Sequence, residues 1–132
     1  RPSASDGVIV LDAGALVALD RDDAAIWARL KTAAEAELPV LIPVAALAQA
    51  WRGGPRQARL ARALHYLDRV SFDELACAAG ELCGRSGTDD VVDASVALVA
   101  ARPGVTHVYT SDEGDIARLL EVQRVKRRVI GC

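Results

Sequence analysis

The stretch VIVLDAGALVALD, residues 8–20, joins a short β-branched run to an apolar segment with helical character. Valine and isoleucine favour strands. The run ends at Asp12, and Gly14 precedes the next apolar segment. This stretch therefore predicts a strand that leads directly into a helix, with an aspartate at the carboxyl end of the strand.

The same alternation of strand and helix continues along the chain. Further strands are predicted at residues 38–43, 69–73, 106–111 and 128–132. Helices are predicted at residues 21–37, 44–51, 56–67, 74–85, 87–101 and 114–122. Alternation of this kind is typical of a parallel sheet with helices on both faces. We therefore expect a three-layer α/β/α fold with a central parallel sheet.

Composition indicates one soluble domain. The chain has 132 residues, which is too short for two full cores. Hydrophobic residues make up 52% of it, which is enough for one continuous core. We expect the domain to span residues 8–132 and treat residues 1–7 as an N-terminal lead outside the fold. No apolar run approaches the roughly 20 residues that span a bilayer, and the lead lacks the apolar region of a signal peptide. We therefore expect a cytoplasmic protein without a membrane anchor.

Aspartates are placed where the predicted fold brings distant segments together. Asp12 ends the first strand and Asp112 ends the fourth, and open α/β sheets bind ligands at the carboxyl ends of their strands. Asp90 and Asp93 are three residues apart, so they share one face of a helix and repel each other. Together with Asp115, these carboxylates predict a site for a hard divalent cation, Mg²⁺ or Mn²⁺.

Each aspartate also has an ordinary structural explanation. Thr88 or Asp89 is expected to cap the helix that follows, and for Asp89 we favour capping over chemistry. Asp12 is also suited to an Asx turn, and Asp115 to the first turn of a helix, where it would complement the dipole. Asp93 lies inside an apolar helix, where capping does not apply, so a functional site is favoured over a solvated face.

Cysteines and histidines offer no alternative site. The three cysteines, Cys77, Cys83 and Cys132, match no zinc spacing, and we expect them to be small buried hydrophobic residues. His65 lies within a predicted helix and His107 within a predicted strand, so structural roles are favoured for both over a role as general base.

A net charge of −2 does not identify a nucleic-acid-binding protein, so local basic patches must provide any such contact. Arg52, Arg56, Arg59 and Arg62 form a row, and the last three recur at intervals of three along a predicted helix. Such a row is suited to contacting RNA phosphates, and equally suited to a solvated helix face. The basic segment at residues 123–128 has the same two interpretations. With 4% aromatic residues, base stacking is not expected to dominate RNA binding.

Four segments in order, VIVLDAGALVAL, PVAALAQAWRGG, TDDVVDASVALVA and VYTSDEGDIARL, resemble the successive motifs of the PIN domain. The closest likeness is to the VapC-type toxins of bacterial toxin–antitoxin (VapBC) pairs, and it covers residues 8–131. Each motif alone is weak, and the set is specific. The resemblance implies a metal-dependent endoribonuclease that hydrolyses RNA, such as tRNA or ribosomal RNA. It also implies a cognate antitoxin that silences the enzyme, and a homodimer, for which residues 24–38 and 56–67 are the candidate surfaces.

By motif position, Asp12, Asp93 and Asp112 correspond to the acidic catalytic centre of the family, with Asp90 and Asp115 beside it. The resemblance thus implies that these carboxylates hold Mg²⁺ or Mn²⁺, which activates a water for attack on phosphorus.

Three neighbouring polar residues belong to the same prediction. Thr110 or Ser111 is expected to hydrogen-bond a metal-bound water or a phosphate. Gln49 stands where the family usually has Glu, in the helix after the second strand. A neutral amide oxygen attracts Mg²⁺ less than a carboxylate does, so we expect weaker metal affinity than in a relative with Glu.

The positions of the aspartates also suggest three alternatives to an active ribonuclease. A phosphatase of the haloacid dehalogenase type needs a second aspartate where this chain has Gly14, and is rejected. A phosphoacceptor receiver domain stays an alternative, although this chain lacks the paired acids at the first strand and the late lysine of that class. The remaining alternative is a catalytically weakened PIN-fold protein that only binds a partner, and cleavage of RNA that EDTA abolishes would distinguish the enzyme from it.

Overall fold

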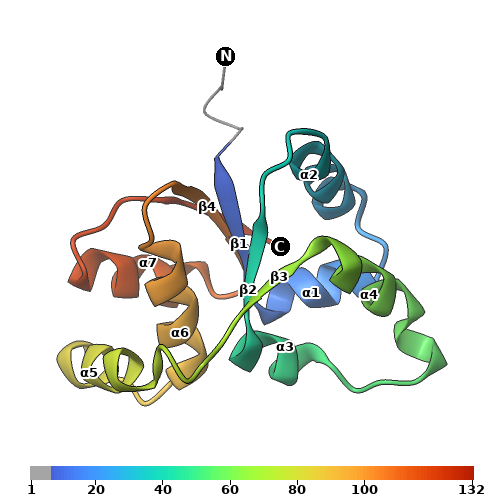
Figure 1. Ribbon diagram of the computed structural model, residues 1–132. Coiled ribbons are helices and arrows are strands. Elements are labelled where there is room, and N and C mark those ends of the chain that lie inside the picture. The colour runs from blue at the N-terminus through green and yellow to red at the C-terminus, as the bar shows by residue number, and fades with distance from the viewer. Residues whose placement is uncertain (1–6) are drawn as a thin grey trace.

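The centre of the protein is a parallel sheet of five strands, seen in Figure 1, a computed structural model that describes residues 7–132. The strands are β1 (Val8–Leu11), β2 (Val40–Pro43), β3 (Asp68–Val70), β4 (Val105–Thr110) and β5 (Arg128–Gly131). Their order across the sheet is β3-β2-β1-β4-β5. The predicted lead, residues 1–7, lies outside the described residues except for Gly7.

Helices form a layer on each side of this sheet (Figure 1). On one side lie α1 (Ala13–Asp20), α2 (Ala24–Glu35) and α4 (Ala58–Ala63), with the 3-10 turns η2 (Pro55–Gln57) and η3 (Leu64–Tyr66) flanking α4. On the other side lie α5 (Ala76–Ser86), α6 (Val91–Ala100) and α7 (Glu113–Val122). The short α3 (Val44–Ala50) follows β2 directly. The predicted three-layer α/β/α fold is thus confirmed. Among the described residues, no helix is long and apolar enough to cross a bilayer.

Burial on both faces of the sheet explains the unbroken apolar runs of the strands. In β1, Ile9 and Leu11 belong to the core beneath α1, α2 and α4. Val10 points to the opposite face, where it packs in a second core with residues of α6 and α7 such as Val96 and Ile116. Strand β1 is therefore held from both sides, which fixes the position of the residue that follows it.

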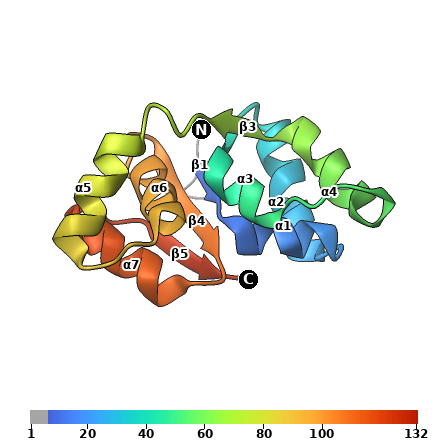
Figure 2. The ribbon, with the colours of Figure 1, turned by 90° about the horizontal axis from the view of Figure 1, so that it is seen from below.

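The strand order reverses beside β1. From β1 the chain moves outward to β2 and β3, then crosses to the other side of β1 to form β4 and β5. Such a reversal leaves a crevice at the carboxyl ends of the two central strands. The backbone N–H of Asp12 donates to the carbonyl of Tyr109 (2.9 Å), so the segments that leave β1 and β4 are joined at this point. Figure 2 views the molecule from the side on which the strands end.

Several element boundaries differ by a few residues from the sequence-based expectation, among them those of β3 and of the helix predicted at 56–67. Strand β3 ends at Val70, three residues earlier than predicted. The predicted helix at 56–67 is divided into η2, α4 and η3. The break before α4 lies at Gln57, whose side-chain oxygen accepts from the backbone N–H groups of Arg52 and Gly53, while its amide donates to the carbonyl of Ala50. These bonds hold Gln57 at the end of η2, so Arg56 does not share a helix with Arg59 and Arg62.

Gly14 provides a test of the close approach between the β1–α1 and β4–α7 junctions. A Cβ at this position would lie 2.5 Å from the Ser111 hydroxyl oxygen and 2.8 Å from the Ser111 backbone nitrogen. Although alanine normally favours a helix, we expect Gly14→Ala to lower the free energy of unfolding by about 1 to 3 kcal/mol through overpacking. Urea denaturation would measure this change.

The matched control is Gly80→Ala, in the helix α5, where nothing lies within 4 Å of the added Cβ. This substitution should raise the free energy of unfolding by about 0.5 to 1 kcal/mol. If both variants were stabilised equally, the two junctions would not be in contact as described.

Candidate metal centre

Three aspartates converge where β1 and β4 end. Asp12 follows β1 and begins α1, Asp93 lies in the first turn of α6, and Asp112 lies between β4 and α7. One carboxylate oxygen from each residue lies within 4.8 Å of the other two. Asp12 and Asp93 are buried, with 2% and 5% of their surface exposed, whereas Asp112 is open to solvent. The structure thus brings together the three residues that the motifs place at an acidic centre.

Thr110, the last residue of β4, connects two of these aspartates. Its hydroxyl donates to Oδ2 of Asp12 (2.7 Å) and accepts from the backbone N–H of Asp112 (2.9 Å). The other carboxylate oxygen of Asp12, Oδ1, accepts from the backbone N–H of Ala13 (2.6 Å). Thr110 is fully buried and its hydroxyl hydrogen is directed at Asp12, so it orients that carboxylate. Ser111 is exposed and packs against Gly14.

Asp90 and Asp93 have different roles despite sharing a helix face. Asp90 is the N-cap of α6, and its Oδ1 accepts from the backbone N–H of Asp93 (3.0 Å). The prediction that Thr88 or Asp89 caps this helix is therefore wrong. The hydroxyl of Thr88 accepts from the backbone N–H of Asp90 (3.1 Å), which places Thr88 and Asp89 in the preceding turn. Asp90 stabilises the helix start, and the Asp93 carboxylate is left to join the cluster.

Burial and mutual repulsion shift the protonation of the cluster. Burial, followed by the negative charges of Asp90, Asp12 and Asp112, raises the pKa of Asp93 to about 7. Burial also raises the pKa of Asp12, although the hydrogen bonds from Thr110 and Ala13 oppose the change. Two unit charges 4.8 Å apart repel by about 3 to 4 kcal/mol at an effective dielectric constant near 20. Without a cation, the cluster therefore relieves its repulsion by keeping a proton.

Asp90 and Asp115 lie beside the three converging aspartates. Together with Asp93 they line a cavity of about 260 Å³ between the α5–α6 loop and α7, where Arg118 forms part of the wall. The negative charge of Asp115 also contributes to the raised pKa of Asp93. These two residues therefore act on the cluster through its electrostatic field, while the close approach of oxygens involves Asp12, Asp93 and Asp112.

The donor set fits a hard divalent cation. Carboxylate oxygens are the ligands that Mg²⁺ and Mn²⁺ prefer, and an oxygen spacing of up to 4.8 Å suits an ion that keeps several bound waters. Among the described residues, the three converging side chains all offer carboxylate oxygens, so the site has oxygen donors alone.

Several other predicted residues lie outside this cluster. Gln49 is exposed on α3. His65 is exposed in η3, whereas His107 is buried in β4, where burial lowers its pKa. The predicted burial of the cysteines is confirmed for Cys83 and wrong for Cys77 and Cys132, which are exposed.

The arginine row is less regular than its spacing suggested. Arg52 donates to the carbonyls of Ala48 and Trp51, and the guanidinium of Arg62 lies over the ring of Trp27, 5.1 Å from its centroid. Arg56, in η2, and Arg59, in α4, are exposed.

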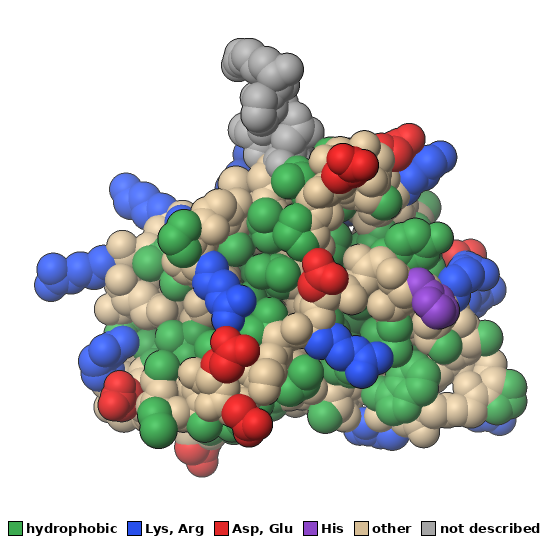
Figure 3. Space-filling view, in the orientation of Figure 1, with side chains coloured by type: hydrophobic (Ala, Val, Ile, Leu, Met, Phe, Trp, Pro, Cys, Tyr) green, Lys and Arg blue, Asp and Glu red, His purple; other side chains and the backbone are tan. Residues whose placement is uncertain are grey.

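The basic segment at 123–128 is also partly structural. The Arg127 guanidinium donates to the carbonyls of Ala100, Ala101 and Arg102, and so satisfies the carboxyl end of α6. In Figure 3, basic and acidic side chains are interspersed over the visible face.

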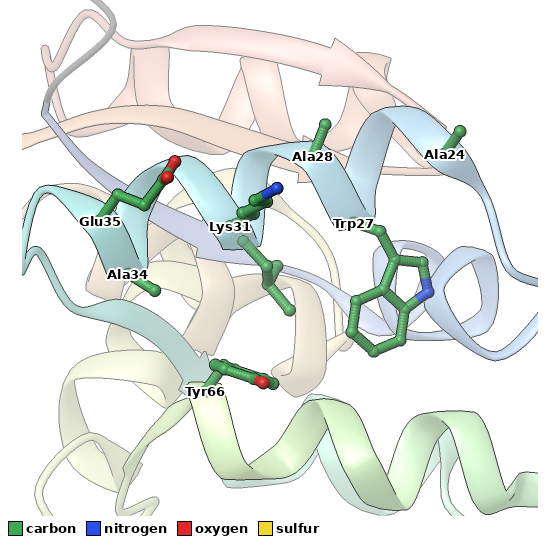
Figure 4. Close-up of a pocket in the computed structure, with 8 residues that line it drawn as sticks. Ala24, Trp27, Ala28, Lys31, Ala34, Glu35 and Tyr66 are labelled. Atoms are coloured by element: carbon green, nitrogen blue, oxygen red, sulfur yellow. The ribbon is translucent and has the colours of Figure 1, made fainter.

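A larger apolar cavity lies on the other side of the sheet. Its volume is about 610 Å³, and it is lined mainly by α2 and by Tyr66 of η3 (Figure 4). The rings of Trp27 and Tyr66 border the hollow, with Lys31 and Glu35 also on α2. Its walls hold a single carboxylate, so it lacks the convergent acids of the metal centre.

Comparison with known proteins does not assign a function to this chain. No protein-family model and no curated protein matches it. A three-layer α/β fold hosts many unrelated activities, so the fold by itself does not choose among them. Function must therefore be inferred from the carboxylates and their surroundings.

Thr110→Val tests whether the buried hydroxyl orients the cluster. Valine keeps the shape of the side chain but removes the bonds to Asp12 and Asp112, so we expect Mg²⁺ or Mn²⁺ affinity to fall about 10- to 100-fold. Isothermal calorimetry would measure it. The control is Thr106→Val, at the amino end of the same strand, which should leave metal affinity unchanged. Equal affinities in all three proteins would contradict the orienting role.

Asp93→Asn tests the raised pKa. The carboxyl group titrates near 3.8 when the chain is unfolded and about 7 when it is folded, so the folded state binds this proton more tightly between these values. In EDTA, the free energy of unfolding should therefore decrease as pH rises from 4 to 7, by on the order of 1 kcal/mol or more.

The Asp93→Asn variant should lose most of this decrease and be more stable than the parent protein at pH 8. Denaturation curves at several pH values would measure the free energy of unfolding of both proteins, with the exposed Asp73→Asn as control. An unchanged pH dependence in Asp93→Asn would show that the carboxyl group is not buried against its neighbours.

Proposed function

We propose that this protein is a Mg²⁺- or Mn²⁺-dependent endoribonuclease that acts as the toxin of a bacterial toxin–antitoxin pair. The observation that carries the proposal is the convergence of Asp12, Asp93 and Asp112 at the switch point of the sheet. Hydrolysis of phosphodiester bonds at hard cations uses sites of this kind. The motif order that resembles VapC-type PIN domains supports RNA, such as tRNA or ribosomal RNA, as the substrate.

The position of Asp112 supports a ligand role over a capping role. An aspartate at a helix start usually accepts a backbone N–H bond, as Asp23 does for α2 and Asp90 for α6. Asp112 occupies the same position before α7, but its side chain makes no capping bond among the described residues. Its oxygen lies instead near those of Asp12 and Asp93. Helix α7 thus lacks the stabilising capping bond that an aspartate at this position can accept.

The roles of the chain's own groups follow from this geometry. Asp12, Asp93 and Asp112 would hold the cation, which when bound neutralises charge on phosphate oxygens and lowers the pKa of a water. Thr110 fixes the Asp12 carboxylate, and Ala13 holds its second oxygen. Asp93 must release its proton before its carboxylate can act as a ligand, so affinity for the cation should increase as pH rises toward about 7.

Outside the cluster, we propose that arginine side chains contact the phosphates of the RNA backbone. Arg52, Arg56, Arg59 and Arg62 are exposed on the α4 side of the molecule, and we propose that they bind phosphates. Arg62 keeps its charge while it stacks on Trp27, which limits its motion.

Partner binding is the second part of the proposal. The apolar cavity between α2 and η3 lies within the residues expected to form a homodimer, and Tyr66 beside it is 52% exposed. An exposed apolar surface of this kind is suited to protein contact, and we propose it for the homodimer. An antitoxin would have to cover or distort the carboxylate cluster to silence it. A toxin that acts on cellular RNA would work in the cytoplasm.

The alternative is a catalytically weakened PIN-fold protein whose role is partner binding. Gln49, in place of the usual Glu, favours this alternative because it leaves one fewer carboxylate on α3. The cavity beside Tyr66 is compatible with both functions. The two differ in whether the purified protein cleaves RNA.

RNA cleavage by purified protein is the deciding measurement. We expect cleavage of tRNA or ribosomal RNA in Mg²⁺ or Mn²⁺ that EDTA abolishes. Asp12→Asn and Asp112→Asn should each lower the rate by at least about a hundredfold, since each removes a ligand charge, while Asp73→Asn should not. Absence of metal-dependent cleavage, with metal binding retained, would favour the partner-binding alternative.

A further inference from the structure

Arg118 lies in the wall of the cavity beside the carboxylate cluster. It is the single basic residue among those that line this cavity, where it faces Asp90, Asp93 and Asp115. Asp93 belongs both to the cluster and to the cavity wall, so the cavity opens directly onto the candidate metal centre. A phosphate held at the cluster would therefore lie near the guanidinium of Arg118.

The guanidinium is held at a defined place. Nη2 of Arg118, on α7, donates to the backbone carbonyl of Ser86, the last residue of α5. Ser86 is buried, and its hydroxyl donates to the carbonyl of Leu82, so the acceptor is itself fixed. A cation is also stabilised near the carboxyl end of a helix. Arg118 is thus anchored by one contact, even though the side chain is exposed.

Most of the hydrogen-bonding capacity of Arg118 is unused. A guanidinium has five N–H donors in a planar fork, and the bond to Ser86 is the one that Arg118 makes among the described residues. Within residues 7–132, the only ion pair with an N–O distance up to 4.0 Å joins Arg102 to Glu74. Arg118 therefore lies beside three carboxylates without pairing closely with any of them.

We propose that Arg118 binds a non-bridging oxygen of an RNA phosphate next to the phosphate at the carboxylate cluster. This inference rests on the proposed ribonuclease function. The planar fork matches the geometry of a phosphate better than an ammonium does. The hydroxyl of Thr88, on the same wall, is a second donor for the same group. Arg118 is then a substrate-binding residue that sets where the RNA backbone lies.

The acidic wall makes this contact depend on the cation. Asp90, Asp93 and Asp115 repel a phosphate while the cluster is metal-free, and a bound divalent cation offsets that repulsion. The contribution of Arg118 to RNA affinity should thus be present in Mg²⁺ and small in EDTA. A purely structural tie between α7 and α5 would show no such dependence.

The test compares Arg118→Ala and Arg118→Lys with Arg85→Ala. Arg85 lies in the last turn of the same helix as Ser86 and is exposed, and it does not line the cavity, so its loss removes an equal charge nearby. Steady-state cleavage of a short single-stranded RNA in Mg²⁺, at several salt concentrations, gives KM, kcat and their salt dependence. Melting temperatures report on folding.

For Arg118→Ala we expect KM to increase by roughly tenfold or more, as for loss of one charge-assisted hydrogen bond, with kcat within about threefold. The slope of log KM against log salt should decrease by about 0.7, the value for one contact to a single strand. Arg118→Lys should recover part of the loss, and Arg85→Ala should match the parent protein.

Two results would overturn the inference. In the first, KM and its salt slope are unchanged in Arg118→Ala. In the second, Arg118→Ala and Arg118→Lys show equal losses of kcat and of melting temperature, as expected if the residue only joins α7 to α5. If the parent protein cleaved no RNA in metal, the proposed function would fail together with this inference. Cleavage by the parent protein with an unchanged KM in the variant would overturn the inference alone.

Discussion

Three carboxylates that repel one another must be held close together where β1 and β4 end, and the surrounding structure depends on this constraint. Asp12, Asp93 and Asp112 come from the starts of three helices, and nothing local in the chain would hold their oxygens within 4.8 Å. The sheet order brings β1 and β4 side by side, the buried hydroxyl of Thr110 links two of the aspartates, and Gly14 permits close contact with Ser111. Each of these features lies in a rigid element, which preserves the geometry of the site.

Much of the fold follows from simple sequence patterns. Apolar runs such as residues 8–11 predict strands buried on both faces, and aspartates after the first and fourth runs must meet if the sheet is parallel. Asp93 was predictable for a different reason, because a carboxylate inside an apolar helix is costly unless it has a partner. These signals are local or periodic, and they suffice to locate Asp12, Asp93 and Asp112 without coordinates.

Features that depend on contacts between distant residues were not predictable in this way. Arg118 finds its anchor at Ser86, 32 residues away, and no pattern in the sequence relates the two. Gln57 interrupts a helical repeat by binding the backbone of the preceding loop, which helix propensity does not anticipate. The cap of α6 is Asp90 and not Thr88 or Asp89, because the hydroxyl of Thr88 forms a turn of its own with the backbone N–H of Asp90.

Assembly of the site must come late in folding, since the hydrogen bond from Thr110 to Asp12 spans 98 residues of sequence. During synthesis the amino-terminal part of a chain leaves the ribosome first, and β1 and β2 are available to pair long before β4 has emerged. The cluster does not exist until the segment from β4 to Asp112 has been released and docked beside β1. A nascent chain therefore carries no assembled carboxylate cluster until β4 has emerged and paired with β1.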